Sequence, residues 1–567
     1  MKIIKRPNRC FLPEDFSFTT WKELEIFFQK LLDREIASLK ELKQFLQDRS
    51  ELESFLEENF AWRYIKMNCD TKSVEKKESF LFFVQEIQPN ISPFSDKLNK
   101  KIVQNKFTSK LPDSYKIFLR KLETSIEIFR EKNVPLFTEI EEESQKYGVI
   151  SSQMMIEHEG EKLTIQQAGK FLESPDRQLR ETIYRAMSDR RLEEKEKLDN
   201  LMDRLIYLRD QVAYNADFEN FRDYKFKKLN RFDYTPKDCE IFHETVKQEI
   251  LPLLKKFQQH RKEVLELDML RPWDLSVDIS GKAELKPFTN SKELVKKTIK
   301  GFSNLDPNFG EYIEIMRDMR HFDLDSRKGK APGGFNYPLY EIGVPFIFMN
   351  AVGTHRDLET MVHEGGHAIH SFLTKDLEIS DLKSTPSEVA ELASQSMELI
   401  SMDFWDLFYT NQADLKRAKQ QKLETSLSIL PWICVVDKFQ HWLYVNPKYT
   451  SVERQKEWMA IVEEFSTQEV DYIGLEEALA YKWQSQLHIF EVPFYYIEYG
   501  FSQLGSIALW KNFLENRKKG LKHYKNFMRL GSTKSIPEIY QAAGISFKFS
   551  ASYVRELAEF VLEQYER

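Results

Sequence analysis

The sequence TMVHEGGHAIHS at residues 360–371 contains the pattern HExxH at His363, Glu364 and His367. On a helix, residues four positions apart lie on one face, so both imidazoles can reach one metal ion. Glu364 is offset from His363 by about 100° around the helix axis, so it can contact a water on the metal rather than the metal itself. Two histidine ligands, a glutamate base and an open coordination position are typical of zinc proteases. The segment therefore predicts a helix that carries a catalytic zinc site.

A catalytic zinc ion needs a third protein ligand, and the residues after His367 restrict the choice. A metzincin would place glycine at position 370 and histidine at 373, where this chain has His370 and Leu373. The spacing of thermolysin-like and aminopeptidase-like enzymes leads to residues 385–387, which include no carboxylate. His370 could face the site, but a packed, hydrogen-bonded histidine is favoured, and His355, which could cap or line the strand-to-helix turn, is given no role.

The next segment, PSEVAELASQSMELI at residues 386–400, offers three glutamates on roughly one helix face: Glu388, Glu391 and Glu398. We expect Glu391, which lies 24 residues past His367, to be the third ligand. Glu388 or Glu398 would then accept the second ring N–H of a ligand histidine. The alternative for these two glutamates is a pair on a solvent-exposed helix face.

A second polar cluster lies in LHIFEVPFYYIEYGF at residues 487–501, where His488 precedes Tyr495, Tyr496 and Tyr499. Taken alone, this segment is typical of aromatic core packing. Peptide-bond hydrolysis, however, creates a tetrahedral oxyanion that histidine and tyrosine donors can stabilise. Beside a zinc site, the cluster is therefore a candidate for the donors of that oxyanion.

Glycine is concentrated around the zinc motif. Seven of the 19 glycines lie within residues 329–366, and GKAPGGFN at residues 329–336 predicts a loop that is flexible or closely approached by another group. PFIFMNAV at residues 345–352 is rich in aromatic and β-branched residues and predicts a strand. Gly365 and Gly366 lie inside the predicted helix, where glycine costs up to about 1 kcal/mol against alanine. We expect substrate or a neighbouring helix to approach them closely.

Outside this segment the chain is poor in turn residues. It has 567 residues, of which 19 are glycine and 20 are proline, well below the usual share of about 12%. That scarcity excludes a many-stranded sandwich, barrel or propeller and predicts a mostly α fold. Helical patterns occur within residues 20–90, 114–147, 176–213 and 236–265. Residues 154–165 instead predict a short hairpin that turns at Glu159 and Gly160.

The overall composition is that of a globular protein, with 41% hydrophobic and 31% charged residues. A net charge of −7 and a pI of about 6.0 argue against a general nucleic-acid partner. Four widely separated cysteines predict no disulfide framework and favour a reducing compartment. The N-terminus lacks the apolar stretch of a secretory signal, and no apolar run is long enough to span a membrane. These features predict a cytoplasmic protein without membrane contact.

Three segments resemble the thimet oligopeptidase and oligoendopeptidase F family of zinc metallopeptidases, and in particular its bacterial Pz-peptidase-like branch. They are HEGGHAIH at residues 363–370, ELASQSME at 391–398 and HIFEVPFYYIEYG at 488–500. The likeness extends from about residue 170 to the end of the chain. It implies a mostly α, two-lobed body with a deep substrate channel and a small β element beside the zinc-binding helix.

The resemblance implies a zinc-dependent oligoendopeptidase that hydrolyses internal bonds of short unstructured peptides. His363, His367 and Glu391 would bind one Zn²⁺ ion, and Glu364 would be the general base for the zinc-activated water. One alternative is a carboxypeptidase or dipeptidyl carboxypeptidase on the same fold, which needs a cationic trap for the substrate carboxylate in the channel. The other is a non-catalytic, peptide-binding helical protein. Oligopeptides are the only expected partners, and a monomer is favoured.

The resemblance also implies that His488 and one or more of the tyrosines stabilise the transition state. We favour Tyr496 and Tyr499 for this role, with Tyr495 in reserve. The predicted strand at residues 346–350 would lie beside the substrate and pair with its backbone, as in other cases of β-augmentation.

We expect three regions along the chain. Residues 1–110 would form an N-terminal helical region, and residues 111–200 a helical region whose hairpin belongs to the channel wall. Residues 201–567 would form the zinc metallopeptidase catalytic region.

Overall fold

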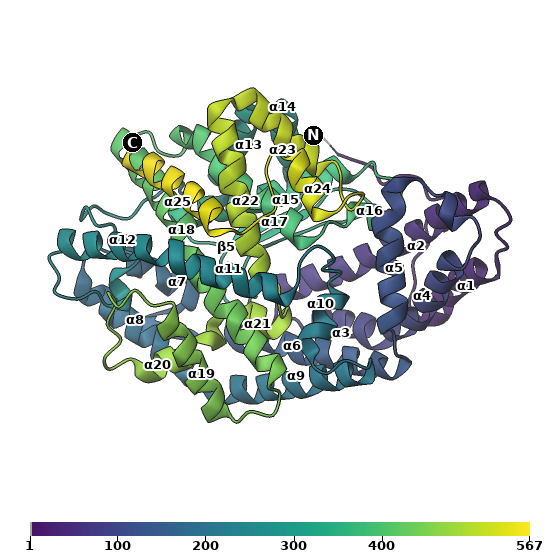
Figure 1. Cartoon of the computed structure of the whole chain (residues 1–567), viewed down its shortest axis with the longest axis horizontal. Helices are drawn as coiled ribbons and strands as arrows, with labels where there is room; N and C mark the ends of the chain where they lie inside the picture. Colours follow the sequence, from purple (N-terminus) through teal and green to yellow (C-terminus); the bar gives the residue numbers. More distant parts are fainter. Residues whose placement is uncertain (1–2) are drawn as a thin grey trace.

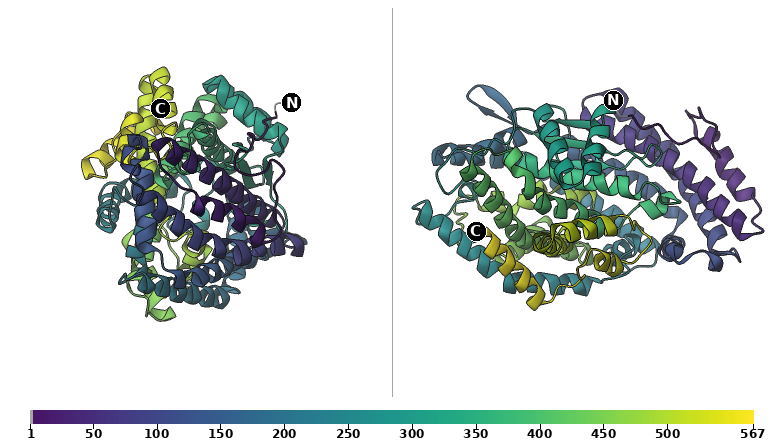
Figure 2. Two further views of the ribbon diagram at one scale, coloured as in Figure 1. Left: turned by 90° about the vertical axis from the view of Figure 1, so that its right-hand side faces the viewer. Right: turned by 90° about the horizontal axis from the view of Figure 1, so that it is seen from above.

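The structure is a computed structural model that describes residues 3–567, and helices make up most of the chain (Figure 1). The N-terminal helices are α1 (Trp21–Asp33), α2 (Leu39–Cys69), α3 (Val74–Phe82), α4 (Gln88–Val103) and α5 (Lys116–Ile128). Their apolar faces form one hydrophobic core, which includes Leu24, Phe45 and Phe118 and is joined by Ile379 and Leu382. Figure 2 shows these purple helices gathered at one end of the molecule.

The rest of the chain builds a second, larger core whose buried residues run from Ile128 to Val561. Its first helices are α6 (Val134–Ser152), α7 (Ile165–Gly169), α8 (Arg177–Leu192), α9 (Lys195–Asn215), α10 (Phe221–Lys228), α11 (Pro236–Glu249), α12 (Leu251–Val264), α13 (Ser291–Leu305) and α14 (Pro307–Asp318). Its later helices are α15 (His355–Thr374), α16 (Ser380–Lys383), α17 (Ser387–Ile400), α18 (Gln412–Val445), α19 (Ser451–Glu464), α20 (Glu476–Ala480), α21 (Leu487–Glu491), α22 (Tyr496–Glu515), α23 (Arg517–Met528), α24 (Ile536–Ala542) and α25 (Ala551–Glu566). The prediction of a mostly α fold is confirmed.

Two of the predicted long helices are interrupted. The pattern across residues 176–213 is divided between α8 and α9 at Glu193 and Glu194. The pattern across residues 236–265 is divided between α11 and α12 at Ile250, because Pro252 has no N–H to continue the helical ladder. Apolar periodicity continues through such breaks, so it did not reveal them. No helix within residues 3–567 combines the length and hydropathy that a membrane crossing requires.

The β structure is small. Strands β1 (Met155–His158) and β2 (Glu161–Thr164) form the predicted hairpin, whose turn residues Glu159 and Gly160 have φ values of 52° and 79°. Strands β3 (Phe322–Asp325), β4 (Phe335–Tyr337) and β5 (Phe346–Ala351) form a second sheet in the order β3-β5-β4.

The predicted pairing of residues 346–350 with substrate is wrong for this sheet. β5 pairs in parallel with β3 on one side and, through residues 346–348, antiparallel with β4 on the other, so both of its edges are occupied along that part of the strand. The sequence predicted the strand but could not show its neighbours. The edge strands are β3 and β4, and β4 follows directly on the glycine-rich loop.

Candidate active site

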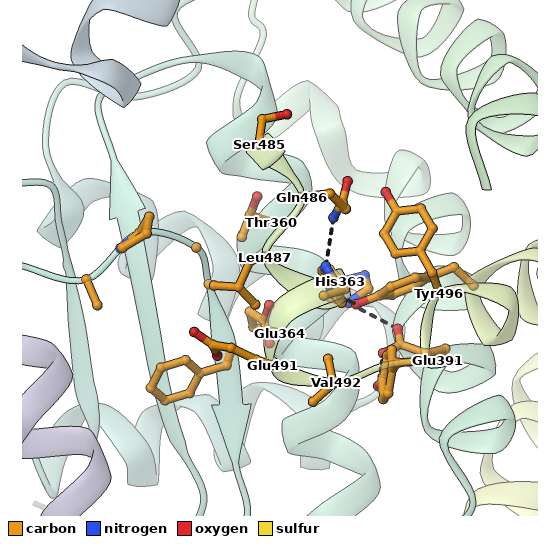
Figure 3. Close-up of a pocket in the computed structure, with 18 of the residues that line it drawn as sticks. Thr360, His363, Glu364, Glu391, Ser485, Gln486, Leu487, Glu491, Val492 and Tyr496 are labelled. Carbon is orange, nitrogen blue, oxygen red and sulfur yellow. Dashed lines mark hydrogen bonds and ion pairs between the residues drawn. The ribbon is translucent and has the colours of Figure 1, made fainter. Parts of the chain in front are cut away.

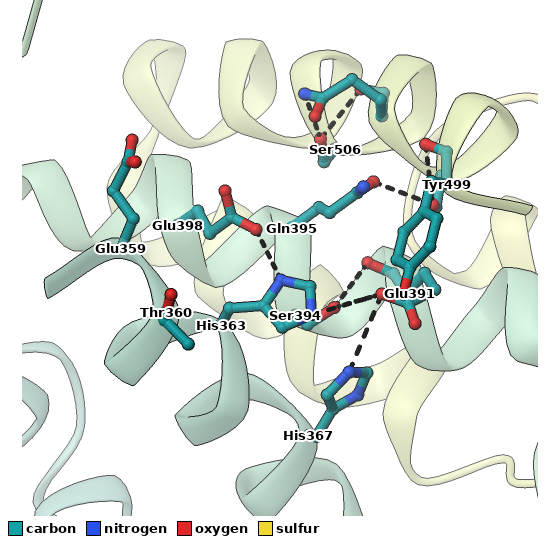
Figure 4. Close-up of polar contacts among 12 residues, drawn as sticks. Glu359, Thr360, His363, His367, Glu391, Ser394, Gln395, Glu398, Tyr499 and Ser506 are labelled. Atoms are coloured by element: carbon teal, nitrogen blue, oxygen red, sulfur yellow. Dashed lines mark hydrogen bonds and ion pairs between the residues drawn. The ribbon is translucent and has the colours of Figure 1, made fainter. Parts of the chain in front are cut away.

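The two histidines of the HExxH motif and Glu391 converge on one point (Figure 4). His363 and His367 lie on α15, and Glu391 lies on α17, which packs against it. Oε2 of Glu391 is 3.4 Å from Nε2 of His363 and 3.7 Å from Nε2 of His367. Ligand atoms around a tetrahedral zinc ion are separated by about 3.3 Å, given bonds of about 2.0–2.1 Å. The three residues therefore fit a divalent metal ion such as zinc.

Glu398 and Lys422 orient the first histidine. Oε1 of Glu398 is 2.6 Å from Nδ1 of His363, which leaves Nε2 directed toward Glu391. The other Glu398 oxygen accepts a hydrogen bond from Lys422 of α18, whose side chain is buried. A carboxylate behind a ligand histidine fixes its tautomer and raises its basicity. Glu388 makes no such contact, because its carboxylate accepts from the Tyr234 hydroxyl at 2.5 Å.

Glu391 is itself held in place by two hydroxyl donors. Tyr495 donates to Oε1 at 2.6 Å, and Ser394 donates to Oε2 at 3.1 Å. Burial alone would raise the pKa of Glu391, but His367, His363 and the Tyr495 hydrogen bond lower it to about 2. Burial lowers the pKa of His367 to about 4. An ionised carboxylate and a neutral imidazole are the protonation states in which these groups bind metal.

Glu364 lies beside the ligand set and next to the glycine-rich loop. Its side chain is 5% exposed, and burial raises its pKa to about 7. Its Oε2 has no hydrogen-bond partner among residues 3–567. A Cβ built on Gly334 would lie 3.7 Å from Oε1, so the loop backbone approaches the carboxylate closely. A buried carboxyl with a pKa near neutrality can both accept and return a proton.

His488 and the three tyrosines line the same cavity as the ligand set, and Figure 3 shows Tyr496 near His363 and Glu391. Nε2 of His488 is 3.2 Å from the Tyr499 hydroxyl, and Gln486 donates to its Nδ1 at 2.8 Å. Burial lowers the pKa of His488 to about 4, so the ring is neutral at pH 7. The Tyr496 and His488 rings meet edge to face, with centroids 5.1 Å apart. The third tyrosine, Tyr495, is engaged with Glu391.

A cavity of about 1190 Å³ opens onto these groups. Its lining combines distant parts of the chain, since Tyr64 comes from α2, Tyr147 from α6 and Arg191 from α8. The volume is above the range of about 300–1,000 Å³ that is usual for small-ligand sites. The site therefore has room for a peptide segment.

The structure thus brings together all of the predicted residues: His363, Glu364, His367, Glu391, His488, Tyr496 and Tyr499. His355 hydrogen-bonds Tyr409, whereas His370 packs against Phe527 and also lines the cavity; neither is among the converging ligand residues. Lys422 and the contact from Tyr495 to Glu391 were missed. A lysine in a lysine-rich chain carries no sequence signal, and only the tertiary structure brings Lys422 to Glu398 and Tyr495 to Glu391.

Gly366 inside α15 allows α15 and α17 to approach each other closely. A Cβ built on Gly366 would lie 2.7 Å from Ser394 Cα and 2.9 Å from the Ala393 carbonyl oxygen. We expect Gly366→Ala to lower the free energy of unfolding by about 1–3 kcal/mol, the usual cost of overpacking. It should also weaken zinc binding, because the two helices carry different ligands. Urea unfolding and zinc competition with a chromogenic chelator would measure both effects.

Gly169→Ala is the matched control for this substitution. Gly169 is also helical, and no atom of the described residues lies within 4 Å of a Cβ built there. That variant should keep wild-type stability and zinc affinity. Equal stability and equal zinc affinity of Gly366→Ala and Gly169→Ala would contradict the explanation that Gly366 is needed for the close approach of α15 and α17.

A helical body whose HExxH helix is joined by a glutamate from a following helix has the ligand arrangement of a metallopeptidase. Comparison with known families is consistent with it: the profile of Peptidase family M3 matches residues 170–559, and that of the Peptidase M3 N-terminal domain matches residues 11–129. The chain belongs to peptidase family M3. The predicted membership of the oligoendopeptidase F group is also confirmed by the relatives.

The chain is similar to the chromosomal oligoendopeptidase F of Lactococcus lactis subsp. cremoris, at 23% identity over 69% of this chain and 64% of that protein. An oligoendopeptidase F homolog of Borreliella burgdorferi is 24% identical over 54% of this chain and 52% of its own length. The chain thus aligns with only about half to two thirds of these curated relatives.

Among solved structures, a Pz peptidase A with an inhibitor superposes with a TM-score of 0.93 at 26% identity. The match covers 97% of this chain and 98% of that chain. A structure described as a putative oligoendopeptidase F has a TM-score of 0.92 at 25% identity, with the same coverage. The fold is therefore shared over nearly the full length.

Proposed function

We propose that this protein is a zinc-dependent oligoendopeptidase that cleaves internal bonds of short, unstructured peptides. The observation that carries the proposal is the convergence of His363, His367 and Glu391 beside an unpaired, buried Glu364. A peptide-binding protein without activity would have no use for the Glu364 carboxylate. The names of the relatives and the large cavity support the same activity.

When bound, zinc would polarise the scissile carbonyl and make a water nucleophilic near pH 7. Glu364 would take the proton of that water and deliver it to the leaving amine. His488 and the hydroxyls of Tyr496 and Tyr499 would donate to the developing oxyanion. Glu398 would keep His363 in the tautomer that presents Nε2, and Tyr495 would hold Glu391.

The substrate backbone would pair with the free edge of β4. Residues 331–336, which include the start of β4, line the cavity, and β4 pairs with β5 on its other side only. An extended peptide can add to such an edge through main-chain hydrogen bonds. A folded protein presents few extended segments and would not fit a cavity of about 1190 Å³.

An internally quenched peptide library with both ends blocked would test the proposal. We expect cleavage at internal bonds, with products mapped by mass spectrometry, and loss of cleavage after chelation. Cleavage that requires a free C-terminus would instead support a carboxypeptidase mode. The cationic side chains of Arg191, Arg356 and Lys383 line the cavity and could hold a substrate carboxylate, which makes this the second candidate function.

Loss of one oxyanion donor should mainly affect turnover. We expect Tyr496→Phe and Tyr499→Phe each to lower kcat by about 10²–10³-fold, with KM and bound zinc little changed. Steady-state kinetics on a quenched peptide would measure this. Tyr481→Phe is the control, because Tyr481 lines the same cavity but its hydroxyl is bound by Gln455 at 2.6 Å. A tyrosine whose loss leaves kcat at the level of this control is not a donor.

A further inference from the structure

A second group of metal-ligand side chains lies between α11 and α18, outside the lining of the active-site cavity. Cys239 and His243 lie four residues apart on α11, and Asp437 and His441 lie four residues apart on α18. Residues at this spacing share one helix face, and the two helices pack against each other. All four are buried, with exposures of 0%, 3%, 0% and 8% in that order.

The ligand atoms of three of them lie close together. One ligand atom each from Cys239, Asp437 and His441 lies within 4.8 Å of the others. The ligand atoms of His363, His367 and Glu391 in the active site are as close to one another. Nε2 of His441 is 3.1 Å from Oδ2 of Asp437. Ligand atoms around a tetrahedral zinc ion lie about 3.3–3.8 Å apart, given bonds of about 2.0–2.3 Å. The group needs little movement to surround an ion.

Some polar atoms of this group are left without a partner. Among residues 3–567, Oδ1 of Asp437 and Nδ1 of His441 have no hydrogen-bond partner, and Nε2 of His441 faces only the Asp437 carboxylate. Phe226 and Phe494 pack against the His441 ring, at centroid distances of 5.8 and 5.3 Å. Buried polar groups are nearly always bonded, and leaving them unpaired is costly. A cation at this point would satisfy the free oxygen and one of the nitrogens.

The charges also balance around a dication. A thiolate at Cys239, a carboxylate at Asp437 and a neutral His441 carry two negative charges, which one divalent ion neutralises. The nearby buried Arg231 is itself paired with Glu498. Binding would release the thiol proton of Cys239 to solvent as the metal–sulfur bond forms. Sulfur and imidazole donors select zinc over magnesium or calcium.

We propose that Cys239, Asp437 and His441 bind a second zinc ion that joins α11 to α18. His243 orients the carboxylate ligand, since its Nε2 lies 3.0 Å from Oδ2 of Asp437. This site is separate from the one that carries the proposed peptidase activity.

The site adjoins the segment that leads into the catalytic tyrosines. Phe494, directly before Tyr495, has a φ of 66°, and its N–H donates to the side chain of Gln440 at 2.8 Å. Its ring packs on His441. An ion bound to His441 would thus also stabilise the position of Phe494 and of Tyr495 and Tyr496, which follow it.

The experiment uses a variant that leaves the second site intact. His363→Ala combined with His367→Ala removes two ligands of the catalytic set, and the purified protein is analysed for zinc by mass spectrometry. We expect about two zinc ions per chain in the wild type and about one in this variant. Absence of zinc from the double variant would overturn the proposal. Unchanged zinc in the double variant would instead contradict the catalytic ligand assignment.

Cobalt substitution identifies the ligand chemistry. The catalytic set has no sulfur, so a thiolate-to-cobalt charge-transfer band in the near ultraviolet can come only from a cysteine-containing site. We expect this band in the double variant, its loss on addition of Cys239→Ser, and its persistence on addition of Cys434→Ser. Cys434 is the matched control, because it is also fully buried and lies on α18. A spectrum without the band in the folded double variant would refute the assignment.

Discussion

Replacement of Glu364 by glutamine is expected to lower kcat for peptide hydrolysis by about 10³–10⁴-fold, near the upper limit of what a general base contributes. The amide has nearly the same shape as the carboxylate but cannot accept the proton of the attacking water. Bound zinc should stay at the wild-type level, because Glu364 is not among the three converging ligand residues. Steady-state kinetics and metal analysis of the same preparation would measure both quantities.

Glu515→Gln makes the same chemical change at an exposed position at the end of α22. It should leave both kcat and zinc content unchanged. If Glu364→Gln retained near-normal turnover, another group would have to act as the base. If it lost zinc, Glu364 would have to be reassigned as a ligand.

Replacement of His367 by alanine is expected to remove the catalytic zinc and abolish peptidase activity. Loss of a group that hydrogen-bonds a metal ligand typically lowers metal affinity by about 10–100-fold, and loss of the ligand itself should lower it further. The buried Glu391 would also lose the imidazole that most lowers its pKa. Metal analysis should show one zinc ion fewer per chain than in the wild type, and excess zinc should restore little activity.

His370→Gln is the control for this variant. His370 is the third histidine of the same helix, and it packs against Phe527 instead of joining the ligand set. That variant should keep its catalytic zinc and most of its activity. Retention of zinc and activity by His367→Ala would contradict the assigned ligand set.

Much of the site could be predicted because the relevant chemistry is local in sequence. His363 and His367 are held on one face by helix geometry alone. Glu391 was the best carboxylate on the next helix, and the structure brings it within 3.7 Å of both histidines. The choice between Glu388 and Glu398 could not be made from spacing, because it depends on how α17 is rotated against α15. The structure places Glu398 at His363 and Glu388 at Tyr234.

The sheet of β3, β4 and β5 shows the same difference between what a local sequence pattern can predict and what it cannot. Its aromatic and β-branched residues predict β5 as a strand, but no local pattern shows that β3 and β4 cover both of its edges. Substrate pairing was therefore predicted for a strand that already has a neighbour on each side. The proposed second zinc site was also invisible in the sequence, since nearly 200 residues separate Cys239 and His243 from Asp437 and His441.

The sequence by itself determined the mostly helical class, the HExxH helix and the residue types of its ligand set, because these follow from composition and from the period of a helix. Only the tertiary structure decided which glutamate supports His363, that Tyr495 holds Glu391, and that β5 is the central strand with β3 and β4 at the edges. Such contacts join residues far apart in the chain. They depend on the rotation and packing of whole elements, which local propensity does not encode.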